Sequence, residues 1–471
     1  MKIDLGKNEL IHFVGIGGIG MSGLALIMNG LGYKVQGSDI AYNKNIERLN
    51  DKKIKIFLNH KRENIKKTTV LVISSAIKKS NPEIQEAIKK NLPIYTRGDM
   101  LGHIVSFMRN IVVTGSHGKT TTTSLVSNIF SISNLDPTII NGGVLNSFGN
   151  SAKLGKSNWC VTESDESDGS FLKIPFVYSI VTNLDYEHLD YYKNISNLKK
   201  SFLEFIEKIP SIGKGFICND DRNLKEVLNK SKNKNFYTYG ENKTSNFQII
   251  NIKQNFKLSS FDMKINIPSK KKIIKNIKLP MIGIHNIRNA AAAAALAFTI
   301  GLPEKYIKLG LCSFKGVQRR FTHLFNHFKV SFYDDYAHHP TEISSVLSGV
   351  KNVYKKKEIV CIFQPHRISR VKNLKYEFSK CFKMADTVLL CPIYSANEKI
   401  KLNFTYNSFA NLIIKNSKVR LILIDDELQL KKFVKQNAFG EKIYIGMGAG
   451  SISSWCNDYA KQFKLEDLNV K

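Results

Sequence analysis

Short segments rich in apolar and β-branched residues alternate with segments of helical pattern along the whole chain. The apolar segments include LIHFVG, YKVQGSD and TVLVISSA, then NIVVTG, WCVTES and FVYSIVTN, and finally VSFYDDY, EIVCIFQP, TVLLCP, VRLILID and KIYIGMG. Strands that alternate with helices form βαβ units, because two parallel strands need a long crossover connection. The pattern therefore predicts an α/β protein with parallel sheets and excludes all-α and all-β folds.

Three such runs divide the 471 residues into three predicted domains. The boundaries lie at residues 1–108, 109–321 and 322–471. The second domain contains an insertion rich in Lys and Asn at about 221–280, and then an alanine-rich helix predicted over 289–299. Each run has the strand and helix order of a nucleotide-binding fold, so we expect three such units in tandem.

Composition narrows the class of protein. The chain has no apolar run of about 18 residues or more, and its N-terminus MKIDLGKNELIHF lacks the apolar stretch of a signal peptide. We therefore expect a cytoplasmic protein with no membrane partner. The seven cysteines form no CxxC pair, which argues against a disulfide network and a zinc site and indicates reduced thiols.

The formal net charge of +31 raises the question of a nucleic-acid partner. The lysines are spread through the chain among isoleucines and asparagines. The densest tracts, SKNKN (231–235) and SKKKIIKNIK (269–278), are typical of solvated edges of β-hairpins. We attribute the charge to composition bias and expect no nucleic-acid partner.

A glycine motif, GIGGIG, follows the first predicted strand and opens a helix. Gly15, Gly17 and Gly20 have the G-x-G-x-x-G spacing, and Asp39 ends the next strand. Such glycines let the backbone approach a diphosphate, which then lies at the helix N-terminus. By itself the motif is equally compatible with NAD, FAD or another nucleotide, and a tight turn without a ligand is the alternative.

The segment VTGSHGKTTTTS (113–124) nearly matches the phosphate-binding loop G-x-x-x-x-G-K-[ST], with Val113 in place of the first glycine. The GSHG turn can direct its N–H groups at an anion, and the helix that follows adds its positive end. The lysine can reach the β- and γ-phosphates, and a threonine hydroxyl can bind Mg²⁺. A threonine-capped helix is the alternative, but the sequence predicts an ATP site at Gly115, Ser116, His117, Gly118, Lys119, Thr120 and Thr121.

Acidic residues and a histidine follow the next two strands predicted for the middle domain. ESDESD (163–168) comes directly after WCVT, and TNLDYEHLDYY (182–192) carries His188 between Glu187 and Asp190. The carboxyl ends of parallel strands share the ligand-binding edge of a sheet, so these side chains can hold Mg²⁺ opposite the phosphate loop. A solvated acidic loop and a structural histidine are the alternatives.

Other polar motifs follow toward the C-terminus. GIHNIRNA places Asn286 and Asn289 on one helix face, where their amides can contact a base or ribose, although Asn286 can equally cap the helix. GVQRRF carries Arg319 and Arg320, which can neutralise a phosphoryl group or form an interdomain salt bridge. DDYAHHPTE and FQPHRISR follow strands of the third domain and have the character of substrate-binding loops.

The motifs TGSHGKTTTT, ESDESDGSF, EHLD, GIHNIRNA, RRF, DDYAHHPTE and FQPHR occur in an order and spacing that closely resemble the Mur ligases. The resemblance covers essentially the whole chain, and the loop with Val113 has the family's own form. It implies an N-terminal Rossmann-like domain for a UDP-sugar, a central P-loop ATPase-like domain, and a C-terminal Rossmann-like domain for the amino acid and part of ATP. The motifs resemble most the members that use ATP and Mg²⁺ or Mn²⁺ to join L-alanine to UDP-N-acetylmuramate through an acyl phosphate.

The resemblance also implies the catalytic residues. Lys119 would contact the β- and γ-phosphates, and Arg320 would approach the phosphates as well. Thr120 and Glu163 would hold one Mg²⁺, and His188 would serve a second. Sister ligases bridge their metals with a carbamoylated lysine, and the sequence assigns this role to no lysine, although Lys199 and Lys200 follow His188.

Binding residues are implied in the same way. The adenine would lie near Asn286 and Asn289, and the ATP ribose near Asp335. The alanine carboxylate would be bound by Tyr336, His338, Arg367 and Arg370. The UDP part of the sugar nucleotide would lie near Gly15, Gly17, Gly18, Gly20, Asp39 and Ser75. We expect a monomer or a weak homodimer.

Two other functions stay open on the sequence alone. A recycling ligase of the same superfamily would add a preformed tripeptide, and the acceptor that the protein uses would distinguish the two. A P-loop ATPase bound to nucleic acid would show ATP turnover that DNA or RNA stimulates and salt weakens. An NAD-dependent enzyme is disfavoured because it would make no use of Lys119.

Overall fold

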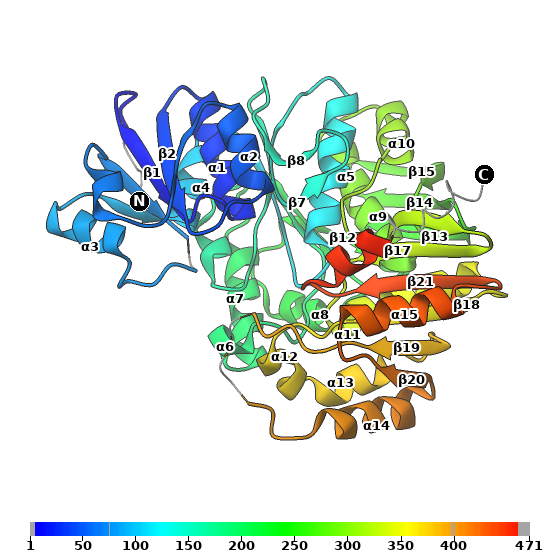
Figure 1. Cartoon of the computed structure of the whole chain (residues 1–471). Coiled ribbons are helices and arrows are strands. Elements are labelled where there is room, and N and C mark those ends of the chain that lie inside the picture. Colours follow the sequence, from blue (N-terminus) through cyan, green and yellow to red (C-terminus); the bar gives the residue numbers. More distant parts are fainter. Residues whose placement is uncertain (1–4, 75, 397, 399–400, 460–471) are drawn as a thin grey trace. The chain divides into compact units, whose positions relative to one another are not determined.

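A computed structural model describes residues 5–74, 76–396, 398 and 401–459 of the chain. These residues form three β-sheets, one in each predicted domain, with helices between the strands (Figure 1). The chain forms two compact units, and the first contains residues 1–253, 260–280 and 286–315. The second unit contains residues 254–259, 281–285 and 316–471. The α/β prediction is confirmed.

The first sheet has five parallel strands in the order β3-β2-β1-β4-β5. Its order reverses between β1 and β4, which is the point where α/β sheets bind ligands. The strands are β1 (Leu10–Val14), β2 (Lys34–Asp39), β3 (Lys55–Leu58), β4 (Val70–Ile73) and β5 (Ile94–Thr96). The helices are α1 (Ile19–Gly30), α2 (Lys44–Asp51), η1 (Arg62–Ile65), α3 (Pro82–Lys89) and α4 (Arg97–Val105).

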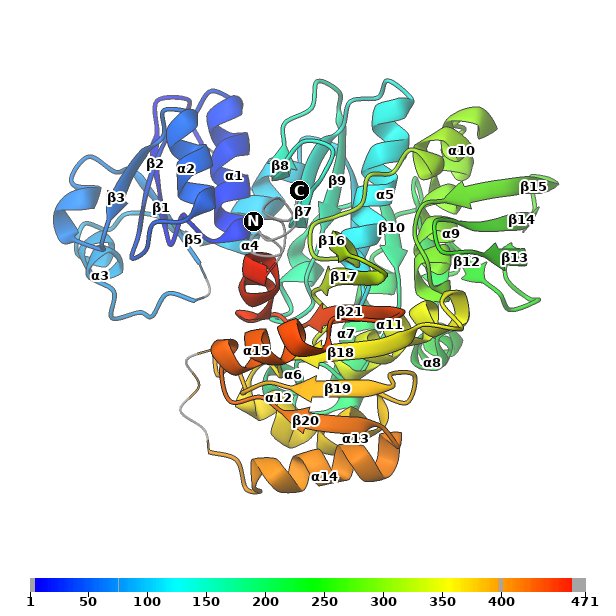
Figure 2. The ribbon, with the colours of Figure 1, turned by 45° about the vertical axis from the view of Figure 1, so that its right-hand side comes forward.

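The second sheet has ten strands in the order β15-β14-β13-β12-β11-β10-β6-β9-β7-β8. Its strands are β6 (Arg109–Thr114), β7 (Thr138–Leu145), β8 (Asn150–Lys153), β9 (Trp159–Glu163), β10 (Tyr178–Val181), β11 (Lys214–Cys218), β12 (Phe236–Gly240), β13 (Phe247–Gln254), β14 (Ser259–Ile267) and β15 (Lys270–Leu279). Its helices are α5 (Lys119–Ile132), η2 (Ser170–Lys173), α6 (Leu189–Tyr192), α7 (Ile195–Glu207), α8 (Arg222–Lys230), α9 (Ile284–Thr299) and α10 (Glu304–Cys312). Strands β12 to β15 come from the predicted insertion and extend the sheet to one side (Figure 2).

The third sheet, of order β16-β17-β21-β18-β19-β20, is parallel except for its edge strand β16. Ile359, Cys361 and Phe363 of β18 belong to one buried cluster, and Val360 and Ile362 to another, so both faces are covered. The strands are β16 (Thr322–His327), β17 (Val330–Asp335), β18 (Glu358–Phe363), β19 (Thr387–Leu390), β20 (Arg420–Leu423) and β21 (Lys442–Met447). The helices are α11 (Pro340–Val353), α12 (Ile368–Asn373), α13 (Lys375–Lys380), α14 (Tyr406–Ser417) and α15 (Glu427–Asn437), and residues 452–459 are also helical.

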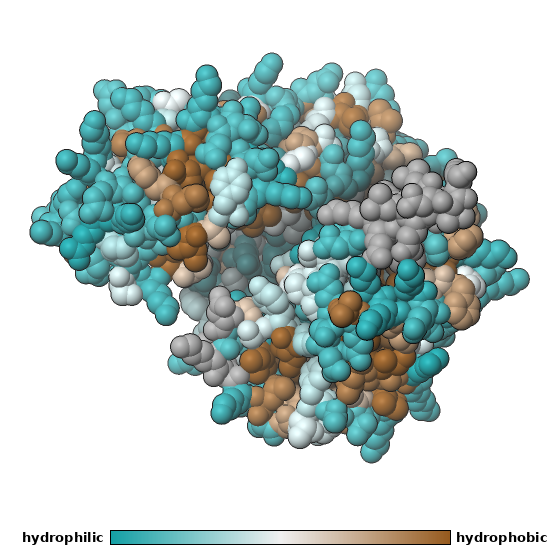
Figure 3. All heavy atoms as spheres, viewed as in Figure 1, coloured by the Kyte–Doolittle hydropathy of each residue, from teal (hydrophilic) through white to brown (hydrophobic). Residues whose placement is uncertain are grey.

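Two expectations about lysine-rich segments had different outcomes. SKKKIIKNIK forms the edge strand β15, as predicted, but SKNKN lies in the coil between α8 and β12, because alternating lysines and asparagines supply no apolar face. Hydrophilic residues cover most of the face drawn in Figure 3. None of the helices in the described part of the chain has the length and apolar character that a membrane crossing requires.

Helix α1 of the first sheet packs against β8 of the second, which joins these two sheets into one unit. Gly23 and Gly30 lie seven positions apart on the contact face of this helix. A Cβ atom on Gly23 would lie 2.9 Å from Ala152 Cβ, and one on Gly30 would lie 2.9 Å from Leu154 Cδ2. The missing side chains therefore allow the close approach.

A similar close contact supports the phosphate-loop helix and can be tested. A Cβ on Gly310 of α10 would lie 2.6 Å from Ile129 Cα of α5, so Gly310→Val must push two helices apart. We expect this change to lower the free energy of unfolding by about 1–3 kcal/mol, measured as a lower urea midpoint. Gly6→Val is the control, because a Cβ there meets no atom nearer than 3.8 Å. Equal midpoints for the two variants would contradict the prediction.

Candidate active site

The phosphate loop connects β6 to α5 through two glycines with left-handed or related backbone conformations. Gly115 has a φ of 126° and Gly118 a φ of 80°, which other residues rarely adopt. A Cβ on Gly115 would overlap Thr182, and one on Gly118 would lie 2.7 Å from Asn289 Oδ1. Both positions therefore need glycine, and the Asn289 amide lies against the loop.

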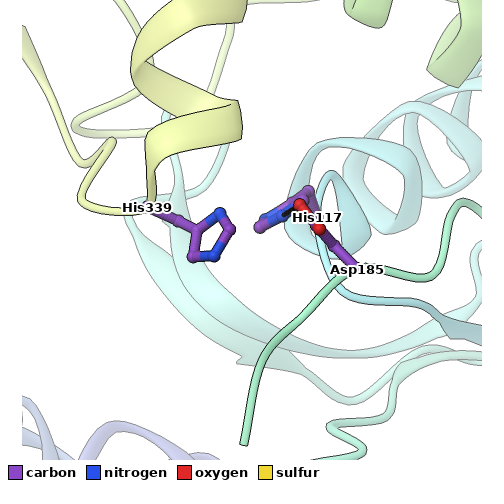
Figure 4. Close-up of side chains that lie close together, drawn as sticks. All are labelled: His117, Asp185 and His339. Atoms are coloured by element: carbon purple, nitrogen blue, oxygen red, sulfur yellow. Dashed lines mark hydrogen bonds and ion pairs between the residues drawn. The ribbon is translucent and has the colours of Figure 1, made fainter. Parts of the chain in front are cut away.

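Asn183, after β10, holds the middle of the loop. His117 N donates to Asn183 Oδ1 (2.8 Å), and Asn183 Nδ2 donates back to the His117 carbonyl (2.9 Å). Ser116 N donates to the Asn183 carbonyl (3.1 Å), so two N–H groups of the predicted anion nest are occupied. The His117 ring pairs with Asp185, with Nε2 2.9 Å from Oδ2 (Figure 4). The first-turn N–H groups of α5 remain to bind an anion.

Lys119 is largely buried and lies among acceptors. Its Nζ donates to the carbonyls of Gly115 (2.7 Å) and Ser116 (3.1 Å) and to Glu166 Oε2 (2.8 Å). Burial alone would lower the pKa of this ammonium group, but the carboxylates of Glu166 and Asp165 outweigh it and raise the pKa above its usual value. Lys119 therefore stays charged, with its ammonium group beside the carbonyls of the phosphate loop.

Asp165, Glu166 and His188 form a cluster that can hold a divalent ion. One ligand atom from each lies within 4.8 Å of the others, and His188 Nε2 is 3.5 Å from Glu166 Oε1. Burial raises the pKa of Glu166 to about 7, although Lys119 opposes the shift. The two carboxylates supply the oxygen ligands that Mg²⁺ and Mn²⁺ prefer, so this part of the donor set fits the predicted metal. Glu166 lies within the predicted ESDESD segment, but the sequence did not single it out.

Glu163 and Thr120, the two residues predicted to share a metal, are in contact with each other. Thr120 Oγ1 donates to Glu163 Oε1 (3.0 Å), and the N–H of Gly142 donates to Glu163 Oε2 (2.6 Å). Burial raises the pKa of Glu163. A Cβ on Gly142 would lie 2.6 Å from Glu163 Oε1, so a side chain at this position of β7 would displace the Glu163 carboxylate. No sequence signal pointed to Gly142, because β7 was not predicted.

Helix α9 begins five residues earlier than predicted, so Asn286 lies within its first turn and the capping interpretation is wrong. The early start follows from Gly283, whose φ of 94° turns the chain into the helix. Asn286 and Asn289 are both buried. Lys199 pairs with Glu226 (2.7 Å) and Lys200 is exposed, so in the described part of the chain neither is bonded to the metal cluster.

The glycine motif of the first sheet is organised by Asp39. Gly17 N donates to Asp39 Oδ2 (2.8 Å), and Gly15 turns with a φ of 80°. Gly18 is the N-cap of α1, so the motif ends at a helix N-terminus as predicted. A Cβ on Gly20 would lie 3.2 Å from Arg97 Cδ, which puts a cationic side chain beside the first turn. Ser75, also expected here, lies outside the described residues.

Asp335 of the second unit is buried and makes two backbone hydrogen bonds. Its Oδ1 accepts from Ala337 N (2.7 Å) and its Oδ2 from Phe321 N (2.7 Å). Burial raises its pKa to about 6, although the charge of Arg320 opposes the shift. Arg320 lies over the ring of Tyr336 and 3.7 Å from Glu342 Oε1. Asp335 therefore shapes the turn that presents these residues.

An aromatic and basic cluster follows in the same unit. The rings of Tyr336 and His338 lie 5.2 Å apart, and the rings of His338 and His366 lie 5.8 Å apart. Arg370 Nη1 is 3.4 Å from His366 Nδ1, and His366 stacks on Tyr394. His338 and Arg370, two of the four residues expected at the amino-acid carboxylate, therefore contact His366, and a third, Tyr336, contacts His338. His366 lies in the FQPHR motif, but the sequence did not single it out. The fourth, Arg367, starts α12 beside them and donates its N–H to the Tyr394 carbonyl (2.8 Å).

Comparison with known protein families matches all three sheets. Residues 10–109 match "Mur ligase family, catalytic domain", residues 113–297 match "Mur ligase middle domain", and residues 319–450 match "Mur ligase, glutamate ligase domain". The chain belongs to the Mur ligase family. The predicted three-domain Mur ligase architecture is confirmed.

Several relatives of this Mur ligase are known. The chain is 63% identical to UDP-N-acetylmuramate–L-alanine ligase of Pelagibacter ubique (strain HTCC1062), over 97% of this chain and 98% of that protein. It is 40% identical to the ligase of the same name from Mesorhizobium japonicum, over 96% and 97% of the two chains.

Solved structures of other ligases superpose on this chain. The crystal structure of UDP-N-acetylmuramate-alanine ligase from Thermotoga maritima superposes with a TM-score of 0.80 at 27% identity and covers 98% of this chain and 99% of that one. A murein peptide ligase from Psychrobacter arcticus superposes with a TM-score of 0.69 at 21% identity, over 97% and 99% of the chains, and shares the fold.

His366 is predicted to be neutral at physiological pH. Burial lowers its pKa to about 4, and His338, Arg370 and Arg367 add to the shift. Because the folded pKa lies below the unfolded value of about 6.5, the folded state binds fewer protons, and stability is lost as pH falls from about 6.5 to 4. Histidine NMR titration, with His366→Gln to identify the signal, should give a pKa near 4, and Arg370→Gln should raise it. A wild-type pKa near 6.5 would contradict this.

Proposed function

We propose that this protein joins L-alanine to the lactyl carboxylate of UDP-N-acetylmuramate, with conversion of ATP to ADP and phosphate, in the synthesis of peptidoglycan precursors. The observation that carries the proposal is the 63% identity, over 97% of the chain, to a ligase named for this reaction. In this proposal, the phosphate loop binds ATP, and the acidic residues beside it bind the metal that ATP requires. The tripeptide-adding ligase and the nucleic-acid-stimulated ATPase have no comparable support.

The ATP phosphates are held by the loop and the start of α5. Lys119 is charged and moves from Glu166 and the loop carbonyls to the β- and γ-phosphates when ATP enters. Thr120 and Glu163 hold one Mg²⁺, and Asp165, Glu166 and His188 hold a second. A bound Mg²⁺ neutralises phosphate charge and lets two anionic reactants approach each other. Asn286, Asn289 and Asp335 serve the nucleoside, and Arg320 the phosphates.

The chemistry proceeds through an acyl phosphate. A carboxylate is a poor electrophile, so one of its oxygens first forms a bond to the γ-phosphorus of ATP while the bond to ADP breaks. The amine of alanine then attacks the carbonyl carbon and loses a proton. The new C–N bond remains when phosphate leaves with the C–O electron pair. Lys119 stabilises the charge on the transferred phosphoryl group. Because the protein binds all the reactants at one site, it holds them close together in the orientation for reaction.

The two substrates bind at the other two sheets. Tyr336, His338, Arg367 and Arg370 bind the alanine carboxylate, for which two guanidinium groups beside a neutral His366 supply the charge. The UDP group lies on the α1 N-terminus, within the loop that Asp39 holds. We further propose that the protein is a monomer or weak homodimer without a nucleic-acid partner.

Phosphate release tests the proposal. With ATP and Mg²⁺, release should require both UDP-N-acetylmuramate and L-alanine, and Lys119→Ala should reduce kcat by about 100-fold or more, because it removes the main charge at the phosphates. Lys200→Ala is the control, since this lysine is exposed. Turnover without UDP-N-acetylmuramate, or turnover that needs a tripeptide or nucleic acid, would assign the protein to the corresponding alternative.

Gly142→Ala tests the position of Glu163. The added Cβ would overlap the carboxylate and turn it away from Thr120. We expect the Mg²⁺ concentration for half-maximal rate to rise about 10-fold, as is common when a residue that orients a metal ligand changes. Gly102→Ala is a suitable control, because its Cβ would meet no atom nearer than 3.6 Å. An unchanged Mg²⁺ dependence would argue against Glu163 as a ligand.

A further inference from the structure

A buried polar network in the first sheet is centred on Glu83 of α3. This residue is fully buried, and each of its oxygens is bound. Its Oε1 accepts from Asn64 Nδ2 (2.6 Å). Its Oε2 accepts from Ser38 Oγ (2.5 Å) and lies 3.2 Å from His60 Nδ1. The mechanism described above does not use this carboxylate.

The contacts of the neighbouring His12 show which of its two ring nitrogens carries the proton. Gln36 Nε2 lies 2.9 Å from the Asn64 carbonyl, so the amide nitrogen, and not the oxygen, faces that side. The same nitrogen donates to His12 Nδ1 (3.1 Å), so the His12 proton sits on Nε2. That N–H points toward Ser38 Oγ (3.4 Å) and Glu83 Oε2 (3.5 Å). His12 is therefore a donor to the same pair of atoms.

The donors around Glu83 keep it charged. Burial would raise its pKa, but the bonds from His12, Ser38 and Asn64 bring the pKa below its usual value. A buried, bonded carboxylate contributes little net stability compared with apolar residues of similar size. Fully satisfied polar networks do fix the position of what they hold. The role of this network therefore depends on which part of the protein it holds in position.

Ser38 is the link between the network and the glycine motif. Its hydroxyl binds Glu83, while its carbonyl accepts from Gly15 N (2.8 Å) and Ile16 N (3.0 Å). The next residue, Asp39, accepts from Gly17 N (2.8 Å). Three successive N–H groups of the motif are therefore fixed by the two residues at the end of β2.

We propose that Glu83 is a positioning residue for the nucleotide subsite: through Ser38 it holds the Gly15–Gly17 backbone in the conformation that accepts a nucleoside diphosphate. This inference rests on the proposed function, which puts the UDP group at this loop. Glu83 touches no substrate. Its effect should appear in the binding of the UDP-sugar and not in the phosphoryl transfer.

Glu83→Gln is the sharpest substitution. Toward Asn64 Nδ2, a glutamine NH₂ would face an amide nitrogen that can only donate. Toward Ser38 Oγ, it would turn that hydroxyl into an acceptor and remove the oxygen to which Ser38 and His12 donate, so both orientations break a bond of the network. Glu86→Gln is the matched control. Glu86 lies on the same helix, and among the described residues its carboxylate is paired only with Lys90, 3.6 Å away, in a partly exposed ion pair.

The experiment measures UDP binding by calorimetry and the kinetics of the complete reaction. For Glu83→Gln we expect about a 10-fold higher Kd for UDP and KM for UDP-N-acetylmuramate, with kcat and the KM for ATP unchanged. The control should match the wild type. If Glu83 acts through Ser38, Ser38→Ala should raise the same two constants, and the double variant should be no weaker than Glu83→Gln alone.

Three outcomes overturn the inference. The first is an unchanged UDP-N-acetylmuramate KM in Glu83→Gln. The second is a parallel change in kcat and both KM values, which indicates a general structural role. The third is additive effects in the double variant. If Glu83→Gln does not fold, the Kd for UDP and the KM for UDP-N-acetylmuramate of Ser38→Ala test the inference instead. Wild-type protein that binds no UDP would overturn the proposed function itself.

Discussion

The buried pairing of Lys119 with Glu166 is the interaction on which the site depends. A lysine ammonium group enclosed in a protein must be matched by a negative charge, and Glu166 lies 2.8 Å away with no exposed surface. Glu166 in turn lies beside Asp165 and His188. One ion pair therefore connects the phosphate loop to the cluster that can hold a metal.

The sheet topology explains why these groups meet. Strands β6, β9 and β10 are parallel neighbours, so the loops after them emerge at one edge of the second sheet. Lys119 follows β6, Glu166 follows β9 and His188 follows β10. The same rule places Asp39 beside the glycine motif at the edge of the first sheet. It also brings the residues after β17 and β18 together in the third.

The sequence was most informative where chemistry and local spacing coincide. The glycines of the phosphate loop, Lys119 and Thr120 were predicted, because a strand, a tight turn and a helix start leave a local signature. Glu163 was implied by the resemblance of the ESDESD segment to the family. Gly142, Asn183 and Glu83 were not, because each acts on a residue distant in the chain. The alternative that Asn286 caps the helix is wrong, since α9 begins at Ile284, directly after the turn at Gly283.

The sequence by itself determined the α/β class, the family and the residue types of the phosphate loop, because alternating periodicity and short motifs are local properties. The tertiary structure decided which acid pairs with Lys119 and that Asp335 binds two backbone N–H groups. It also decided that a glycine in β7 holds Glu163 and that Ser38 links Glu83 to the glycine motif. These contacts join segments that are far apart in the chain. The packing of strands and helices determines the distances between such segments, and the local spacing of residues in the sequence does not.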